Sequence, residues 1–198
     1  MKTAEPIRNK QQVENLLSYY KNKNQTRNHL LIAIGIYSGL RISDILNLSC
    51  DDVYDFKSKT IRKKIHLTEK KTGKSKIIPI HTEVRKALRA YLPDAKPNTP
   101  LILNPRTNKA ISRIQAHRII NVAGKAINLS FAISAHSLRK TFGYHSWKDG
   151  ISPTVIMEIF NHTSFATTRR YLGVSQDDKD VAYNSLCFVS ADSIKISA

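Results

Sequence analysis

The sequence predicts a mainly α-helical protein with a small antiparallel β-sheet, an α+β fold, and three observations support this. Apolar residues recur at helical spacing in the first quarter of the chain and again in its C-terminal half. Between residues 53 and 80 the pattern changes to short runs of β-forming residues separated by turn sequences. The chain has 198 residues, of which 41% are hydrophobic, and this is enough to bury the core of one domain.

Helices are expected in the first fifty residues. Apolar residues at 13–17 have helical spacing, and a second helix should begin near residues 25–28 and run through the apolar stretch at 30–40. That stretch is about half the ~20 residues that a membrane span requires. We therefore interpret it as a buried helix that ends at Gly39.

The segment RISDILNL at 41–48 follows directly. It places its apolar residues on one side of a short helix, and Arg41 lies in the first turn of that helix. The chain then changes to the runs VYDF, KTIRKKIHL and KIIPI, which we expect to form the antiparallel sheet. The last two runs are separated by a lysine-rich turn with Gly73 at its bend, so Lys71 and Lys74 should lie at a hairpin tip.

Helical signals return after the sheet. A helix is expected at 82–92, a loop at 93–100 and a short strand or buried extension at 101–103. Further helices are expected at 111–129, 137–148, 152–160 and 164–171. Residues 176–198 form a C-terminal tail that can contain one more helix.

The charge of the chain predicts a polyanionic partner. The formal net charge is +17 and the sequence pI is about 10.0. Residues 57–76 hold nine Lys or Arg and one acid, Glu69, while residues 101–148 hold eight Lys or Arg and no acid. The tail carries four acids against two lysines, so we do not expect it to be a nucleic-acid-binding arm.

Cysteine content and the N-terminus predict a cytoplasmic protein without a membrane anchor. The two cysteines, Cys50 and Cys187, cannot form a disulfide framework or a four-thiolate zinc site. The N-terminal residues contain no apolar signal region. Composition alone leaves open whether the chain is a passive nucleic-acid binder or an enzyme that acts on nucleic acid.

Three clusters of residues bear on that choice. They are GLRISDILNL at 39–48, which contains Arg41, HSLRKT at 136–141, which contains His136 and Arg139, and FNHTSFATTRRYLG at 160–173, which contains His162 and Tyr171. Each cluster alone is more often structural: an arginine after a helix stop is commonly solvated or paired with an acid, and a tyrosine at helical spacing is commonly core.

Taken in order, and together with KTGKSKIIPI at 71–80, these clusters resemble the tyrosine recombinases, also called the phage integrase family. The resemblance covers about residues 10–175 and implies that residues 1–175 have the catalytic-domain fold of that family. It implies the catalytic set Arg41, Lys71, His136, Arg139, His162 and Tyr171. Lys70 and Lys74 flank Lys71 in the same turn and remain alternatives to it.

The sequence departs from the family pattern near three of these positions. Lys140 stands where the family often has His, and Phe160 begins a tripeptide that is more commonly Leu-Gly-His. Asp44 stands where the family often has Glu. We expect Asp44 to orient Arg41 through a charge-assisted hydrogen bond.

The resemblance implies site-specific DNA recombination through a 3′-phosphotyrosyl intermediate at Tyr171. Arg41 and Arg139 would stabilise the charge on the phosphate, because a guanidinium offers fixed, bidentate donors at any working pH. His136 would take the tyrosine proton, Lys71 would protonate the leaving 5′ oxygen, and His162 would donate to a phosphate oxygen. We expect no cofactor and no metal, since the sequence has no carboxylate cluster for Mg²⁺ and no Cys/His spacing for Zn²⁺.

The implied partner is double-stranded DNA, bound by a homotetramer on paired sites, with accessory DNA-bending or excision proteins. The tail at 176–198 would dock on its own body or on a neighbouring subunit. We expect no N-terminal core-binding domain, so the chain is either a fragment or a short stand-alone member. A type IB topoisomerase-like activity and a passive DNA-binding protein are the alternatives, and the target sequence and direction of recombination stay open.

Overall fold

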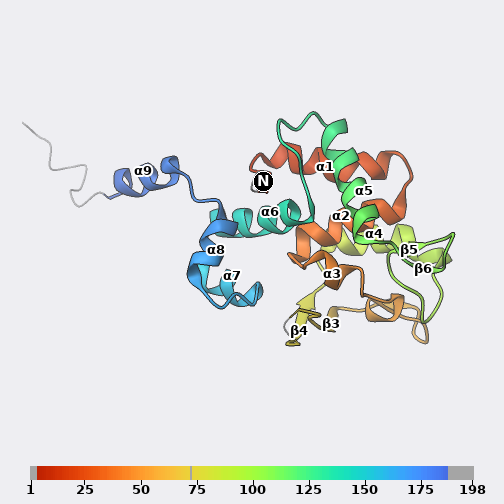
Figure 1. The fold of residues 1–198 in the computed structure, drawn as a ribbon. Helices are drawn as coiled ribbons and strands as arrows, with labels where there is room; N and C mark the ends of the chain where they lie inside the picture. The colour runs from red at the N-terminus through yellow and green to blue at the C-terminus, as the bar shows by residue number, and fades with distance from the viewer. Residues whose placement is uncertain (1–3, 72, 187–198) are drawn as a thin grey trace, which may run out of the picture.

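The computed structural model describes residues 4–71 and 73–186 as a helical body with small β-hairpins (Figure 1). The α-helices are α1 (Lys10–Asn22), α2 (Thr26–Ser38), α3 (Ile42–Ile45), α4 (Thr82–Tyr91), α5 (Arg113–Ala126), α6 (Ala135–Lys148), α7 (Pro153–Ile159), α8 (Phe165–Leu172) and α9 (Gln176–Asn184). The strands are β1 (Tyr54–Asp55), β2 (Thr60–Ile61), β3 (Lys64–Thr68), β4 (Ser75–Pro79), β5 (Leu103–Asn104) and β6 (Lys109–Ala110), and 3-10 helices span Cys50–Asp52 and Leu92–Asp94. The predicted mainly α fold with small antiparallel strands is confirmed.

Helix α2 forms the centre of the body. It packs against α1, α4 and α6, and its residues from Leu30 to Ile36 are buried, as the apolar stretch predicted. The helix ends at Gly39, whose φ of 59° lies in the left-handed region. A side chain at this position would place its Cβ 2.7 Å from a ring carbon of Phe142, so the helix stop also permits close packing against α6.

The segment before α1 is part of the body. Ile7 is fully buried, and its backbone N–H donates to the hydroxyl of Thr141 on α6 over 2.9 Å. Its carbonyl lies 2.9 Å from Nε2 of His145 on the same helix. These contacts fix the N-terminal residues to the helix that also carries His136 and Arg139.

The strands form three two-stranded hairpins, where the sequence analysis expected one small sheet. Strands β3 and β4 pair antiparallel with Ile65 opposite Ile78, and both side chains are buried. Strands β1 and β2 are only two residues long and form a separate hairpin. The third hairpin, β5–β6, begins at the end of the strand that we expected at 101–103 and was not itself expected. Helix α5 begins after it because Ser112 and Gln115 form a capping box.

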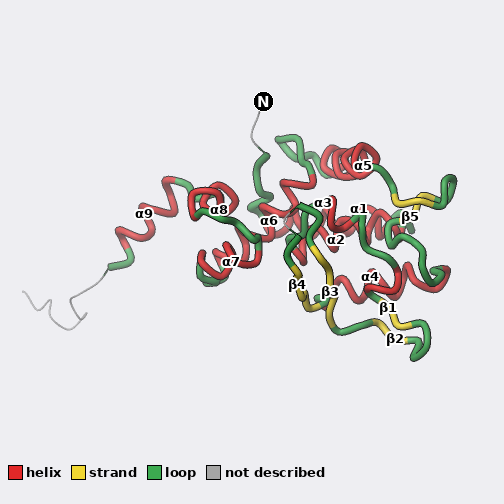
Figure 2. Tube along the Cα trace, turned by 60° about the horizontal axis from the view of Figure 1, so that its bottom comes forward, coloured by secondary structure: helices red, strands yellow, loops and turns green. Residues whose placement is uncertain are grey.

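Helices α6, α7 and α8 form the C-terminal part of the body, and α9 extends away from it (Figures 1 and 2). Helix α9 has no buried residue, and Lys148 on α6 forms an ion pair with Asp178 near its start. Val181, Tyr183 and Leu186 are exposed, whereas Phe188 of the predicted tail lies outside the described residues, as does Cys187. No helix in the described part of the chain is both long enough and apolar enough to span a membrane.

Candidate active site

One cleft of about 500 Å³ brings together the three sequence clusters and the β3–β4 turn. It is lined by Arg41, Ile42, Ser43, Lys70, Lys71, Arg113, Ala135, His136, Arg139, His162, Thr167 and Tyr171. All six residues of the expected catalytic set are in this lining, although they come from positions up to 130 residues apart in the chain. The fold therefore places the six side chains around one volume.

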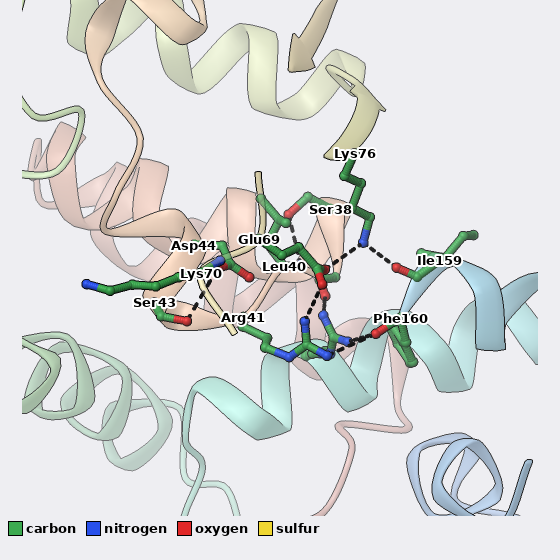
Figure 3. A network of polar contacts seen from close by, with 12 residues as sticks. Ser38, Leu40, Arg41, Ser43, Asp44, Glu69, Lys70, Lys76, Ile159 and Phe160 are labelled. Carbon is green, nitrogen blue, oxygen red and sulfur yellow. Dashed lines mark hydrogen bonds and ion pairs between the residues drawn. The ribbon is translucent and has the colours of Figure 1, made fainter. Parts of the chain in front are cut away.

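Arg41 enters the cleft from the N-terminal end of α3. It is the N-cap residue of this short helix, two positions after the left-handed Gly39 that ends α2. Its guanidinium donates to Oε2 of Glu69 over 2.8 Å and to the carbonyl of Phe160 over 3.1 Å (Figure 3). Two acceptors from different elements thus fix the orientation of the guanidinium plane.

Arg139 forms the floor of the cleft from α6. It is 1% exposed and donates to the carbonyls of Gly39 and Phe160 over 2.6 and 2.8 Å. Its guanidinium lies 4.2 Å from the centre of the Phe160 ring. Burial, and next the charge of Arg41, lower the pKa of Arg139 to about 10, which leaves it charged at neutral pH. Because both arginines bond to one carbonyl, their guanidinium groups lie side by side.

Tyr171 and His136 face each other across the cleft. The phenol oxygen of Tyr171, on α8, lies 3.4 Å from Nδ1 of His136, in the first turn of α6. Partial desolvation of the imidazole, followed by the charges of Arg139 and other cations, lowers the pKa of His136 below its usual value. His136 is therefore neutral at pH 7 and able to accept a proton.

His162 lies in the turn between α7 and α8. Its Nδ1 is 3.0 Å from the hydroxyl of Thr168, and its ring packs against the rings of Phe160 and Tyr171. Burial, with the charges of Arg139 and then Arg41, lowers the pKa of His162 to about 4. A neutral His162 that accepts the Thr168 proton at Nδ1 carries its own proton on Nε2.

The lysine-rich turn between β3 and β4 contributes Lys70 and Lys71 to the lining of the cleft, but not Lys74. Lys71 is exposed at the turn. The backbone N–H of Lys70 donates to Oδ1 of Asp44 over 3.1 Å, and this bond attaches the base of the turn to α3. The turn is thus joined to the element that carries Arg41.

The prediction that Asp44 orients Arg41 is wrong. Asp44 is buried, but its carboxylate accepts from Lys70 and Ser43, and the carboxylate that bonds to Arg41 is Glu69. Asp44 is in the first turn of α3 and directs its carboxylate to the hairpin, whereas Glu69 approaches the guanidinium from the end of β3.

Sequence reasoning also missed four residues of the site. They are Glu69, Lys76, Arg113 and Thr168. Glu69 could have been found, because a single acid within a strongly basic hairpin is a signal for a specific cation partner. In residues 4–71 and 73–186, no three His, Cys, Asp or Glu side chains are grouped closely enough to hold a metal ion.

Known proteins resemble this chain over most of its length. Residues 8–177 match the family model described as "Phage integrase family". The chain is 40% identical over 185 residues to "Probable integrase/recombinase YoeC" of Bacillus subtilis (strain 168), and the match covers 92% of this chain and 97% of the relative. It is 32% identical over 143 residues to "Tyrosine recombinase XerC" of Pelobacter propionicus, covering 71% of this chain and 45% of that protein.

Solved structures share the fold. The crystal structure of XerA recombinase superposes with a TM-score of 0.75 at 24% identity, covering 92% of this chain and 66% of that one. XerH site-specific recombinase bound to its difH substrate gives a TM-score of 0.70 at 19% identity, covering 93% of this chain and 55% of that one.

The chain therefore belongs to the phage integrase family, the tyrosine recombinases, whose class of function is site-specific DNA recombination. It spans almost the whole of the Bacillus relative and about half the length of the relatives named XerC and XerD.

Proposed function

We propose that this chain cuts and rejoins DNA strands at specific sites, with Tyr171 as the nucleophile. One observation carries the proposal: the phenol oxygen of Tyr171 lies 3.4 Å from Nδ1 of a neutral His136, in a cleft with two adjacent guanidinium groups. A nucleophile beside a base, next to fixed positive charge, is the arrangement that phosphoryl transfer needs. The six residues implied by the family resemblance supply it.

In the cleavage step, the Tyr171 oxygen forms a bond to the phosphorus while the bond from phosphorus to the 5′ oxygen breaks. The tyrosine proton moves to Nδ1 of His136, because a phenol with a usual pKa of about 10 needs a base at neutral pH. Lys71 gives a proton to the leaving 5′ oxygen. The products are a 3′-phosphotyrosyl bond and a free 5′ hydroxyl, and attack by another strand's 5′ hydroxyl reverses the step and rejoins the DNA.

Positive charge stabilises the pentavalent transition state. Arg41 and Arg139 would donate to the non-bridging oxygens, and His162 would donate from Nε2. The donors are held by protein acceptors before DNA arrives, so little reorganisation is needed in the reaction. Loss of one such donor should slow cleavage by roughly 10²–10³-fold, by analogy with oxyanion-hole deletions.

Double-stranded DNA is the proposed substrate, and the charge of +17 supports it. If about six phosphates are contacted, the affinity should fall by about 10³ between 50 and 200 mM salt. The substrate also suggests that the protein works in the cytoplasm.

We further propose that the active assembly is a homotetramer on paired sites, in which α9 docks on a neighbouring subunit. The exposed apolar residues Val181 and Tyr183 on α9, and Leu186 just after it, support this docking, because large exposed apolar side chains gathered in one short segment favour burial. Accessory DNA-bending or excision proteins would act on this assembly. Residues 1–175 would be its catalytic domain.

A covalent-trapping experiment tests the proposed function. A preferred duplex is first selected from a random-sequence library with Tyr171→Phe protein, and is then made with a nick that lets the cleaved fragment diffuse away. Wild-type protein should form a covalent adduct without added metal, and Tyr171→Phe should form none. The matched control is Tyr144→Phe, which changes a partly exposed tyrosine on a different helix, α6. It should form the adduct at the wild-type rate.

The same trapped reaction distinguishes the alternatives. Absence of an adduct with any duplex would support a passive DNA-binding protein. An adduct together with relaxation of plasmids that lack the selected sequence would support a topoisomerase-like activity, whereas strand exchange between two selected sites supports recombination.

A further inference from the structure

Glu69 is a buried acid in the most basic segment of the chain, and its surroundings deepen the proposed function, on which this inference rests. It follows the last residue of β3 and is 0% exposed, while its neighbours Lys70 and Lys71 are exposed. An ionised carboxylate that is removed from water is strongly unfavourable unless it is paired. A buried Glu69 is therefore expected to pair with cations.

Two cations contact the Glu69 carboxylate from opposite sides (Figure 3). Oε2 accepts from Arg41 over 2.8 Å, and Oε1 lies 3.5 Å from Nζ of Lys76. Lys76 is on β4, is largely buried, and also donates to the carbonyl of Ile159. Glu69 thus joins the hairpin to Arg41 at a point behind the cleft, where it has no contact with solvent.

The charges at this point are unequal. Arg41 and Lys76 form ion pairs with the Glu69 carboxylate, and Arg139 is near enough for the charges of Glu69 and Asp44 to act on it. Burial lowers the pKa of Lys76, and Glu69 opposes that change. Three cations against the carboxylates of Glu69 and Asp44 leave an excess of positive charge for a phosphate.

The backbone of Glu69 also fixes the turn that carries Lys71. Its N–H donates to the carbonyl of Lys74 over 2.9 Å, and its carbonyl accepts from the N–H of Gly73 over 2.8 Å. The side chain and the backbone of one residue therefore connect Arg41 with the start of the lysine turn.

We propose that Glu69 is a positioning residue for strand cleavage, which holds the Arg41 guanidinium in the orientation that meets the scissile phosphate. It lies outside the lining of the cleft and touches no reacting atom, so it acts through Arg41. The contact is specific because, within residues 4–71 and 73–186, the Arg41 guanidinium donates to just one other acceptor, the Phe160 carbonyl.

The test measures single-turnover cleavage of the nicked duplex described above. Glu69→Gln keeps the shape of the side chain but removes its charge, and it should slow cleavage by about 10²-fold, the effect expected when a reacting group is misplaced by about 1 Å. Affinity for the uncleaved duplex should change less than threefold. Glu83→Gln, which removes an exposed carboxylate paired with Lys86, is the matched control and should cleave at the wild-type rate.

A double-mutant cycle separates positioning from a general structural effect. If Glu69 acts through Arg41, Glu69→Gln should slow an Arg41→Ala protein less than threefold, because the group that it positions is already absent. An equal loss of rate in the wild-type and Arg41→Ala backgrounds would overturn the inference. Wild-type cleavage by Glu69→Gln would overturn it too.

A second variant keeps the test valid if Glu69→Gln is unstable. Adding Lys76→Met removes a buried cation that has lost its counter-charge, so the double variant should regain much of the stability. Its cleavage should stay about 10²-fold slow, since Arg41 still lacks its partner. Recovery of both stability and cleavage would contradict positioning, and a wild-type protein that forms no adduct would instead refute the proposed function.

Discussion

The ring of Phe160 supports three residues of the candidate site, and replacing it gives the most quantitative prediction. Phe160 is fully buried at the C-terminal end of α7. Its ring centre lies 4.2 Å from the Arg139 guanidinium, 5.2 Å from the His162 ring and 5.4 Å from the Tyr171 ring. The leucine that is commoner in the family would fill the core but would not provide these ring contacts.

The cost of Phe160→Leu follows from these contacts. A swap between large apolar side chains of similar volume costs less than about 1.5 kcal/mol. Loss of a desolvated cation–π contact with Arg139 adds about 2 kcal/mol. We therefore expect a decrease of about 2–3 kcal/mol in the free energy of unfolding, measured by urea denaturation. Because Tyr171 and His162 lose a packing surface, single-turnover cleavage should also slow by about tenfold or more.

A matched substitution on the next helix controls for the chemical change. Phe165→Leu, at a ring that is 50% exposed on α8, should change stability by no more than about 0.5 kcal/mol. In an Arg139→Met background, the cost of Phe160→Leu should shrink by about 2 kcal/mol. If Phe160→Leu and Phe165→Leu have the same effect, the reasoning on the ring contacts is refuted.

Three further predictions follow from the fold and the site. Burial and nearby cations lower the pKa of His136 below the usual 6.5, so this base is neutral at pH 6.5 and above. The rate of cleavage at subsaturating DNA should therefore stay constant from pH 8 to 6.5 and fall only at lower pH. A fall that begins above pH 7 would contradict the role of His136 as the base. Gly39→Ala combines left-handed backbone strain of about 1–2 kcal/mol with a Cβ that lies 2.7 Å from Phe142, so it should lower the free energy of unfolding by about 2–4 kcal/mol, measured by urea denaturation. Gly73→Ala has open space around the new Cβ and should show the strain alone. Deletion of residues 176–198 should weaken pairing of two DNA sites, measured by gel shift, more than binding of one site, and equal losses would count against docking in a neighbour.

Much of the fold could be predicted because local patterns determine it. The apolar stretch at 30–40, its glycine stop and the helical spacing near Tyr171 each specify an element without help from distant residues. The division of the strands into separate hairpins could not be predicted in the same way. It depends on how the short β1–β2 pair packs away from β3–β4, and two-residue strands carry almost no periodic signal.

The candidate site shows the same limit. The six expected residues could be carried over from ordered motifs, and the structure brings all of them to one cleft. The partner of Arg41 could not be found from local spacing, because Asp44 is three residues away and Glu69 is 28 residues away. Only the packing of the hairpin on α3 decides which of the two carboxylates reaches the guanidinium.

The identity of the residue that becomes linked to DNA tests the central claim most directly. The trapped adduct can be digested with nuclease and trypsin and its peptides sequenced by mass spectrometry. We predict that a 3′-linked nucleotide is carried by Tyr171, in the peptide of residues 171–179. A nucleotide on any other side chain, or a linkage to the 5′ phosphate, would contradict the arrangement of nucleophile, base and arginines described above.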